Sequence, residues 1–373
     1  MVENSEKSQM VFHPLMDVDN EHVKESAFVK RENIKVLTYN IFLRPPPVKN
    51  NENDFKNERL EEFIKLELKN FDIICLQEMF GSLTTRRHEL IKSAYKSGLF
   101  YHVEVPSPSF FSKNTIDAGL VILSRFPIIE SEFRPFKYTV LACSLVEKGI
   151  LYAKIHIKDS NLIVFNLHLQ ASYFNPKEDI YDVCVKTRLS HIEETAEYIN
   201  EILENTEIND NETVLLMGDF NVDAHNFITR KEKLGKEVPD CDEYKLLIEK
   251  LNEKFVTHDL WLKKFEKHPY TYGKTGVIAG KKYDQVLTDK GDHGNLQTLD
   301  YIFEISKKKS EHSKSTENVE DLNQKKNLII DYDSMKLEEF LIEDKPFQQL
   351  SDHFGASVEI KYRNNNKNSS LLD

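Results

Sequence analysis

Hydrophobic residues occur along the chain in short runs of strand length, separated by polar segments. Runs of this kind, rich in Val, Ile, Leu and Phe, are typical of buried β-strands, whereas apolar residues spaced three and four apart predict helices. Both patterns are present here, and the strand pattern is the more frequent. The predicted strands are 34–39, 72–77, 100–105, 119–124, 150–157, 162–168, 213–218, 300–305 and 355–362, and the predicted helices lie around 60–68, 189–203 and 243–251.

The order of these elements predicts an α/β fold. Helices and strands that are interspersed along one chain pack as layers around a shared core. Several neighbouring strands have no helix between them, so we expect hairpins and mixed sheets rather than a purely parallel sheet.

The same pattern sets the predicted domain boundaries. Residues 1–32 and 363–373 are polar and are predicted to be terminal tails, which leaves 33–362 as a single domain. A charged stretch interrupts this domain, and its first part has almost no apolar residues. We therefore predict a disordered surface insertion at about 306–346.

Composition and charge narrow the class of protein. Hydrophobic residues form 40% of the 373-residue chain, which is enough for a sizeable core and excludes wholesale disorder. The 62 acidic and 50 basic residues give a net charge of −12. This balance argues against a stable nucleic-acid partner, because such proteins neutralise many phosphates with Lys and Arg.

Cysteine usage and the absence of targeting patterns suggest a location. The four cysteines (Cys75, Cys143, Cys184 and Cys241) lack Cys-x-x-Cys spacing and indicate free thiols in a reducing compartment. The first residues show no signal-peptide pattern, and no run reaches the roughly 18–20 apolar residues of a membrane span. We therefore expect a cytoplasmic, monomeric protein whose contact with a membrane is peripheral.

Polar side chains stand at the ends of several predicted strands, where the ligand crevice of an open α/β sheet lies. Taken singly, each has an ordinary explanation as a turn residue, a cap or a hydrogen-bonded core histidine. Together, in one predicted domain, they indicate a functional site. They are Asn40, Glu78, His168, Asp219, Asn221, Asp300, Asp352 and His353.

The donor and acceptor atoms of this set suit phosphoester hydrolysis. Glu78 and Asn40 offer hard oxygen ligands of the kind that Mg²⁺ prefers. A cation held there would act as a Lewis acid on a phosphoryl group. His353, next to Asp352, has the chemistry of a general base, and His168 could donate to a phosphoryl oxygen or to the leaving group.

Four short motifs resemble those of the endonuclease/exonuclease/phosphatase superfamily and occur in that superfamily's order. They are TYN (38–40), QE (77–78), GDFN (218–221) and SDH (351–353), and each ends, follows or directly precedes a predicted strand. The resemblance implies a four-layered, DNase-I-like α/β sandwich, in which two packed mixed sheets are flanked by helices, with metal-dependent phosphoesterase activity.

Within this superfamily the chain looks most like the neutral sphingomyelinases. Leu167 and His191 stand where those enzymes usually have Thr and Gln. The stretches that carry the resemblance are NLHLQAS (166–172), DAGLVILSRFPI (117–128), LDYIFEI (299–305) and KTRLSHIEETAEYI (186–199).

The resemblance implies a metal site. Glu78 would be the principal Mg²⁺ ligand, supported by Asn40, and Mn²⁺ could substitute for Mg²⁺. Asp219 would position the water and the phosphate and also touch a metal. Asp352 would be linked either to a metal or to the general base.

The resemblance also implies catalytic roles. His353 would be the general base, with Asp300 and Asp352 as its orienting or metal-linked carboxylates, two roles that the sequence does not separate. Asn221 would help to position the phosphate, and His168 would stabilise the transition state or assist the leaving group. Water would attack sphingomyelin or a lyso-choline phospholipid, releasing phosphocholine with ceramide or a monoacylglycerol.

Some features leave alternatives open. Phe110 and Phe111 lie in a Pro/Ser-rich loop, where adjacent aromatics could enter a membrane interface or fold back onto the core. A nuclease, a deadenylase or a phosphoinositide phosphatase of the same superfamily would share the metal residues. A non-catalytic binding module with this fold is the alternative from another class.

Overall fold

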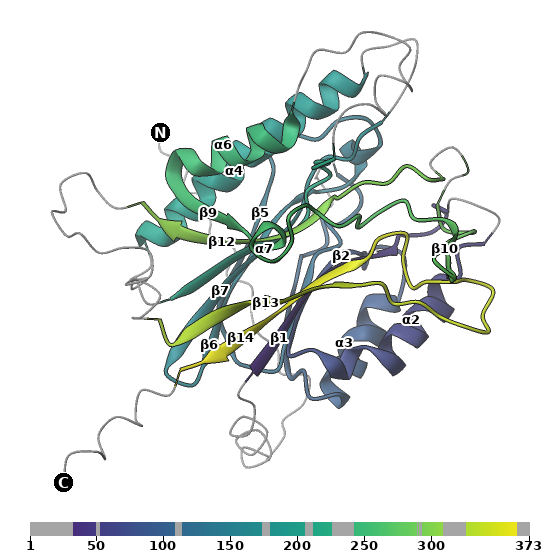
Figure 1. The fold of residues 1–373 in the computed structure, drawn as a ribbon, viewed down its shortest axis with the longest axis horizontal. Helices are drawn as coiled ribbons and strands as arrows, with labels where there is room; N and C mark the ends of the chain where they lie inside the picture. The colour runs from purple at the N-terminus through teal and green to yellow at the C-terminus, as the bar shows by residue number, and fades with distance from the viewer. Residues whose placement is uncertain are drawn as a thin grey trace, which may run out of the picture.

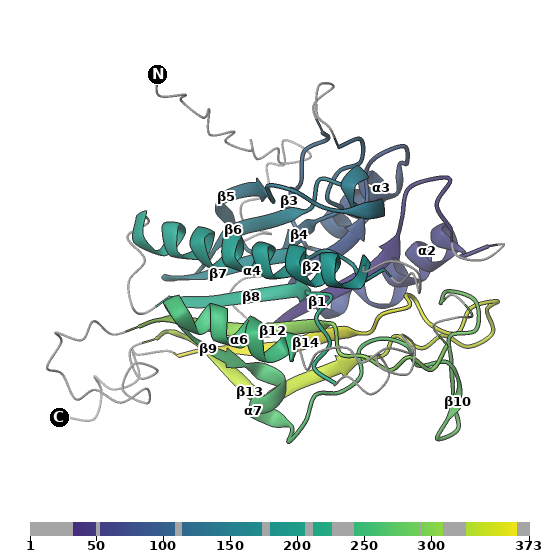
Figure 2. The same ribbon diagram turned by 90° about the horizontal axis from the view of Figure 1, so that it is seen from above.

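Two six-stranded β-sheets face each other at the centre of the computed structural model, and helices cover their outer faces (Figures 1 and 2). This arrangement confirms the predicted four-layered α/β sandwich. The structure describes residues 33–49, 53–108, 114–173, 180–205, 212–225, 242–288, 290, 293–308 and 326–363.

The first sheet has the strand order β13-β14-β1-β2-β4-β3. Its centre is mixed, because β1 pairs in parallel with β2 and antiparallel with β14. The strands are β1 (Asn33–Leu43), β2 (Ile73–Met79), β3 (Tyr101–Glu104), β4 (Val121–Ser124), β13 (Leu328–Glu338) and β14 (Gly355–Tyr362).

The second sheet has the strand order β5-β6-β7-β8-β12-β9. It is also mixed, since β7 and β8 are parallel while β12 pairs antiparallel with β8. The strands are β5 (Ile128–Pro135), β6 (Gly149–Ile157), β7 (Ser160–His168), β8 (Thr213–Asp219), β9 (Phe255–Asp259) and β12 (Asp300–Lys307). A separate hairpin consists of β10 (Gly276–Ile278) and β11 (Lys281–Tyr283).

Each sheet has its own pair of covering helices, and the two pairs lie on opposite sides of the molecule (Figure 1). The helices α2 (Lys56–Leu66) and α3 (Arg86–Lys96) pack against the first sheet, and α4 (Ile180–Asn205) and α6 (Glu243–Lys254) against the second. The remaining helical segments are α7 (Leu260–Lys264), η1 (Leu68–Asn70) and η2 (Leu141–Leu145). None of the described helices combines the length and the apolar character needed to cross a bilayer.

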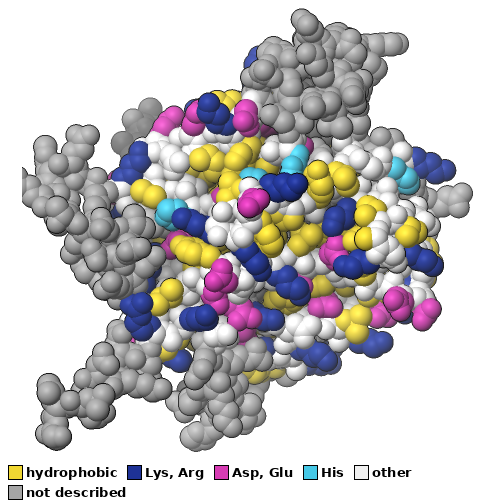
Figure 3. Space-filling model, in the orientation of Figure 1, with side chains coloured by type: hydrophobic (Ala, Val, Ile, Leu, Met, Phe, Trp, Pro, Cys, Tyr) yellow, Lys and Arg dark blue, Asp and Glu magenta, His cyan; other side chains and the backbone are white. Residues whose placement is uncertain are grey.

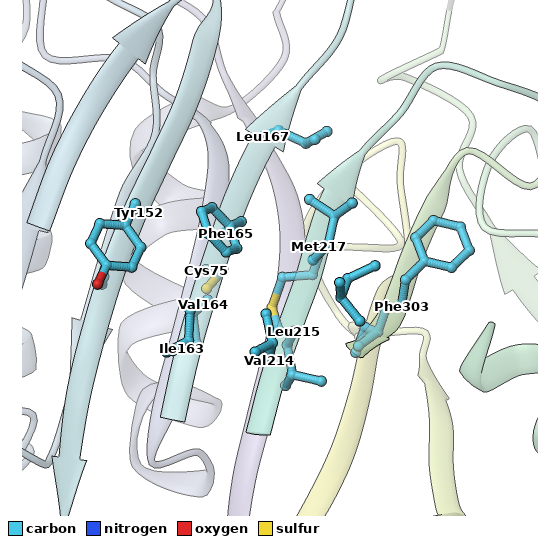
Figure 4. Close-up of a cluster of buried hydrophobic side chains, with 14 of the residues drawn as sticks. Cys75, Tyr152, Ile163, Val164, Phe165, Leu167, Val214, Leu215, Met217 and Phe303 are labelled. Atoms are coloured by element: carbon cyan, nitrogen blue, oxygen red, sulfur yellow. The ribbon is translucent and has the colours of Figure 1, made fainter. Parts of the chain in front are cut away.

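The alternation of side chains along β1 shows how one strand contributes to two cores. Val36 belongs to the cluster between the sheets, whereas Leu37 and Tyr39 pack with Phe63 of α2. Because both faces of the strand are covered, its sequence is almost continuously apolar. Figure 4 shows part of the larger hydrophobic cluster, which extends over both faces of the second sheet, with side chains of β6, β7, β8 and β12 drawn together with Cys75 of β2.

A buried polar bridge joins the two sheets directly behind the strand ends. The Gln77 amide donates to the side chain of Asn166 at 2.7 Å and to Thr38 Oγ1 at 3.0 Å. Asn166 in turn donates to the Leu76 carbonyl at 3.0 Å. Since these amides are fully buried, their mutual hydrogen bonds offset part of the desolvation cost and fix how one sheet is placed on the other.

Every predicted strand and helix overlaps an element of the structure, but the predicted insertion at 306–346 is too long. Strand β13 lies within that range and pairs antiparallel with β14, with Ile330 and Met335 buried. Its sequence alternates charged and apolar residues, a pattern that a sheet with one solvated face requires. Residues 309–325, both tails and the cysteine at 241 lie outside the described residues.

Candidate active site

The predicted site residues meet at one edge of the two sheets. In the parallel pair β7 and β8, His168 lies beside Asp219, and in the antiparallel pair β8 and β12, Asp219 lies beside Asp300. Asn40 of β1 reaches the same place from the first sheet, since its amide donates to Asp219. The carboxyl ends of parallel strands share one sheet edge, which explains why distant motifs converge here.

Asp219 occupies the centre of the site. Its Oδ2 accepts from Asn40 Nδ2 at 2.9 Å and lies 3.5 Å from His168 Nε2 and 3.8 Å from His353 Nε2. Its Oδ1 accepts from the backbone N–H of Asn221 at 2.9 Å. Burial raises the pKa of Asp219, although the attraction of His353 opposes this shift.

His353 is paired with Asp300. The ring atom Nδ1 lies 2.9 Å from Asp300 Oδ2, and both side chains are buried. Burial by itself favours the neutral ring, but the carboxylates of Asp300 and Asp219 outweigh it and hold the pKa of His353 well above its usual value. The pair leaves Nε2 facing Asp219, which is the arrangement of an imidazole oriented by a carboxylate.

Asp352 is close by, but its hydrogen bond lies elsewhere. The Ser351 hydroxyl donates to the Asn40 carbonyl at 2.6 Å, and the same oxygen lies 3.2 Å from Asp352 Oδ1. Burial raises the pKa of Asp352 to about 7, with His353 opposing and Glu78 adding repulsion. The geometry thus separates the two carboxylates that the sequence left equivalent, because the hydrogen bond to His353 belongs to Asp300.

The carboxylates have free lone pairs that a divalent cation could use. Glu78 Oε1 accepts from Asn40 at 3.2 Å, while Glu78 Oε2 and Asp300 Oδ1 are buried and have no hydrogen-bond partner among the described residues. Asp219, Asp300 and His353 offer ligand atoms within 4.8 Å of one another. A set of oxygen donors with unpartnered buried lone pairs fits a hard cation such as Mg²⁺.

His168 is held as a neutral imidazole. Burial, together with repulsion from Lys148 and His353, holds its pKa well below the usual value. Its Nδ1 is buried and has no hydrogen-bond partner within the described part of the chain. A neutral ring has one N–H, so His168 is suited to donating a hydrogen bond rather than carrying a positive charge.

The backbone before Asp219 needs glycine. Gly218 has a φ of 143°, and a Cβ at this position would lie 2.1 Å from the Leu167 carbonyl oxygen. A side chain there would push β8 away from β7 and separate Asp219 from His168. This close approach gives the Gly of the GDFN motif a structural reason.

Lys148 and Arg59 belong to the site, although the sequence gave no signal for them. Lys148 is buried beside Asp219 and Glu78, and its Nζ donates to the Leu169 carbonyl at 2.8 Å, which also accepts from the Asn221 amide at 3.3 Å. A single lysine before an apolar strand is ordinarily a surface residue, so only the fold reveals this buried charge.

Arg59 of α2 holds the end of β1 and the loop before the SDH motif together. It is fully buried, and its guanidinium donates to the carbonyls of Ile41 and Phe42, just after Asn40, and of Leu350, just before the SDH motif. Phe110 and Phe111, the predicted membrane contact, lie outside the described residues.

The four layers, with a polar site at one edge of both sheets, define the DNase-I-like class of α/β sandwich. Residues 37–303 match the Endonuclease/Exonuclease/phosphatase family, and the chain belongs to this family. A sphingomyelinase of Dictyostelium discoideum is 27% identical over an alignment that covers 88% of this chain and 98% of that protein.

Solved structures show the same fold. The crystal structure of SmcL has a TM-score of 0.59 and 19% identity, covering 88% of this chain and 99% of that one. A beta toxin from Staphylococcus aureus with bound magnesium ions has a TM-score of 0.55 and 18% identity, covering 89% of this chain and 100% of that one.

Proposed function

We propose that this chain is a divalent-metal-dependent phosphodiesterase of the phospholipase C type. Its substrate would be sphingomyelin or a lyso-choline phospholipid, and its products phosphocholine with ceramide or a monoacylglycerol. The similarity to a sphingomyelinase along nearly the whole of both chains supports this lipid substrate class. A net charge of −12 also favours a lipid over a nucleic acid.

The observation that carries the proposal is the position of Asp219 between two histidines of opposite protonation preference. The pKa of His168 is held low and that of His353 is held high, although both rings lie within 4 Å of the same carboxylate oxygen. Pairs of groups whose pKa values are pushed apart are characteristic of acid–base sites.

Glu78, Asn40, Asp219 and Asp300 are the residues that would hold the cation. When bound, Mg²⁺ or Mn²⁺ would act as a Lewis acid on a phosphoryl oxygen of the substrate. The unpartnered buried oxygens of Glu78 and Asp300 support this assignment. The proposal gives Asp352 no ligand role, because its Oδ1 lies 3.2 Å from the Ser351 hydroxyl.

The chain's own residues supply the proton transfers. His353, in its neutral form, would take a proton from the attacking water at Nε2, while Asp300 accepts a hydrogen bond from the Nδ1–H and stabilises the ring once it is charged. Asp219 and Asn221 would orient the water and the phosphate. His168 would donate a hydrogen bond to a phosphoryl oxygen, where negative charge builds up as the new bond forms.

A lipid substrate requires contact with a membrane, and we propose that the β10–β11 hairpin makes it. Val277 is 65% exposed and Ile278 42%, next to the exposed Lys281 and Lys282. Figure 3 shows hydrophobic and basic side chains together on this part of the surface. Apolar tips beside lysines fit a bilayer with anionic headgroups.

The hairpin is held in place by one acidic residue of the first sheet's loops. Glu339 accepts from Lys274 at 2.9 Å, Lys281 at 2.6 Å and Tyr283 at 2.8 Å. These three donors outweigh the effect of burial and lower the pKa of Glu339 to about 2, so the Glu339 carboxylate stays ionised at every ordinary pH.

A headgroup-release assay tests the function. Purified protein is incubated with sphingomyelin, lysophosphatidylcholine, phosphatidylcholine, a phosphoinositide and DNA with abasic sites, each with Mg²⁺ and with chelator. Metal-dependent release of phosphocholine from one of the first two supports the proposal. DNA cleavage, release of inorganic phosphate, or no turnover of any substrate would each contradict it.

A further inference from the structure

The Asp300–His353 pair bridges two sheets that do not otherwise pair at this point. Asp300 begins β12 of the second sheet, and His353 lies two residues before β14 of the first. Their 2.9 Å contact therefore depends on how two separate backbone segments are aligned. A shift of about 1 Å in either segment would disrupt a catalytic alignment of this kind.

One short segment, residues 271–273, binds to both backbones. On the side of the second sheet, the N–H groups of Thr271 and Tyr272 donate to the Gln297 carbonyl at 2.9 and 3.0 Å. On the side of the first sheet, the N–H of Phe354 donates to the Thr271 carbonyl at 2.7 Å. The segment thus connects the residues before Asp300 with the residue after His353.

The hydroxyl of Thr271 adds a second connection to β12. Its Oγ1 accepts from the N–H of Leu299 at 2.9 Å and from the N–H of Asp300 at 3.2 Å, and Thr271 is fully buried. Loss of the hydroxyl would leave two buried N–H groups without this acceptor, which a backbone avoids by moving. The moving residue would be Asp300 itself.

The other two residues of this segment restrict where its backbone can lie. The ring of Tyr272 lies beside that of His353, with the ring centroids 5.0 Å apart and the planes tilted by 54°. Gly273 has a φ of 86°, and a Cβ there would lie 2.0 Å from the Asn295 carbonyl oxygen. The turn after Tyr272 therefore packs closely against the loop that leads into β12.

We infer that Thr271 is a positioning residue, whose hydroxyl and carbonyl together align Asp300 with His353. The expected effect on turnover rests on the proposed hydrolytic function. The alignment of Asp300 with His353 does not depend on it. We expect the hydroxyl to affect turnover rather than substrate binding, because Thr271 bonds to backbone groups of Leu299, Asp300 and Phe354 and not to the side chains proposed to hold the phosphate.

Two substitutions at this position and one elsewhere form the test. Thr271→Val removes the hydroxyl at constant shape, and Thr271→Ser restores it. Thr213→Val is the matched control, because Thr213 is equally buried and donates to the Leu328 carbonyl at 2.6 Å at the far end of β8. Should Thr271→Val fail to fold, Thr271→Ala takes its place with the same expected result.

The kinetic readout is hydrolysis in sphingomyelin–detergent mixed micelles. We expect Thr271→Val to lower kcat by about 10- to 100-fold with KM within about 2-fold, and Thr271→Ser and Thr213→Val to stay close to wild type. Equal kcat in Thr271→Val and Thr213→Val, or equal losses in the Val and Ser variants at position 271, would overturn the inference.

A spectroscopic readout decides the inference without any activity. In metal-free, ¹⁵N-histidine-labelled protein, the hydrogen-bonded Nδ1–H proton of His353 is identified by its absence in His353→Gln. We expect this signal to shift or disappear in Thr271→Val and to remain in Thr271→Ser and Thr213→Val. An unchanged signal in Thr271→Val refutes the inference, whereas inactive wild type with the expected NMR pattern refutes only the proposed function.

Discussion

At the scale of single residues, burial and charge give chemically similar side chains different properties. Asp300 and Asp352 both follow from the sequence as candidates, yet only Asp300 bonds to His353. His168 and His353 are both buried, but the pKa of His168 is lowered and that of His353 is raised, because the carboxylates lie unevenly around the two rings. Residue type alone therefore does not assign a role.

The residue-scale prediction concerns Glu78 and His353. Glu78→Gln removes one charge from the candidate metal site, and His353→Ala removes the candidate base, so each should lower phosphocholine release by about 100-fold or more. Circular dichroism should show an unchanged fold. Glu58→Gln, an exposed acid in the first turn of α2, is the matched control and should behave as wild type. Substantial turnover in either site variant would refute the assignment.

At the scale of elements, segments that carry no candidate catalyst still shape function. The β10–β11 hairpin presents its apolar tip because a two-residue turn, Ala279 and Gly280, with φ values of 49° and 79°, reverses the chain. Helix α4 instead presents a histidine to the interior. His191 is buried, stacks on Phe136 with ring centroids 4.0 Å apart, and lies 2.8 Å from the Tyr138 carbonyl.

The hairpin predicts a difference between membrane and soluble substrates. Val277→Ser combined with Ile278→Ser should reduce hydrolysis of sphingomyelin in vesicles by roughly 30-fold, because about 1 kcal/mol of apolar burial is lost per side chain. Hydrolysis of a soluble choline phosphodiester should not change. Leu262→Ser on α7, where Leu262 is 45% exposed, controls for loss of surface hydrophobicity. Equal losses on both substrates would exclude the hairpin as a membrane contact.

His191 predicts a loss of stability in acid. Burial lowers its folded-state pKa to about 4, whereas the unfolded value is near 6.5. The unfolded state therefore binds the proton first, so this contribution is complete above about pH 6.5 and is lost as the pH falls towards 4, by about 3 kcal/mol. In urea titrations, His191→Gln should lose less stability than wild type between pH 6.5 and 4. Parallel pH curves for the two proteins would contradict the prediction.

At the scale of the whole molecule, the site exists only where the two sheets are packed together. Asn40, Glu78 and His353 come from the first sheet or its loops, and His168, Asp219 and Asp300 come from the second. The Gln77–Asn166 bridge fixes this packing from inside, and Arg59 holds the end of β1 to the loop before β14 within the first sheet. A ligand that holds residues of both sheets must therefore stabilise the fold.

Metal binding predicts a shift in thermal stability. If Mg²⁺ binds the folded protein alone, at about 100 times its Kd it adds about 2.7 kcal/mol, which raises the Tm by several degrees. Calorimetry with Mg²⁺, and again after chelator, measures this rise. Glu78→Gln should lack it and Glu58→Gln should retain it. A Tm that is insensitive to Mg²⁺ in wild type would contradict a metal site between the sheets.

The sequence by itself determined the local elements and supplied most of the candidate site residues that the fold brings together. Apolar runs such as 213–218 become strands because both faces are buried, and a polar residue directly after such a run, such as Asp219, stands out against the pattern. The order of the short motifs around Asn40, Glu78 and His353 predicted the fold class, because it resembles the order found in the endonuclease/exonuclease/phosphatase superfamily.

Only the tertiary structure decided which of these residues touch. Asp300 and His353 are 53 positions apart, and Arg59 and Leu350 are 291 apart, so their hydrogen bonds depend on packing that no local pattern encodes. The sequence also did not reveal that β13 belongs to the first sheet, or the roles proposed for Lys148 and Thr271. A charged strand, a single lysine and a single threonine resemble surface residues until their neighbours are known.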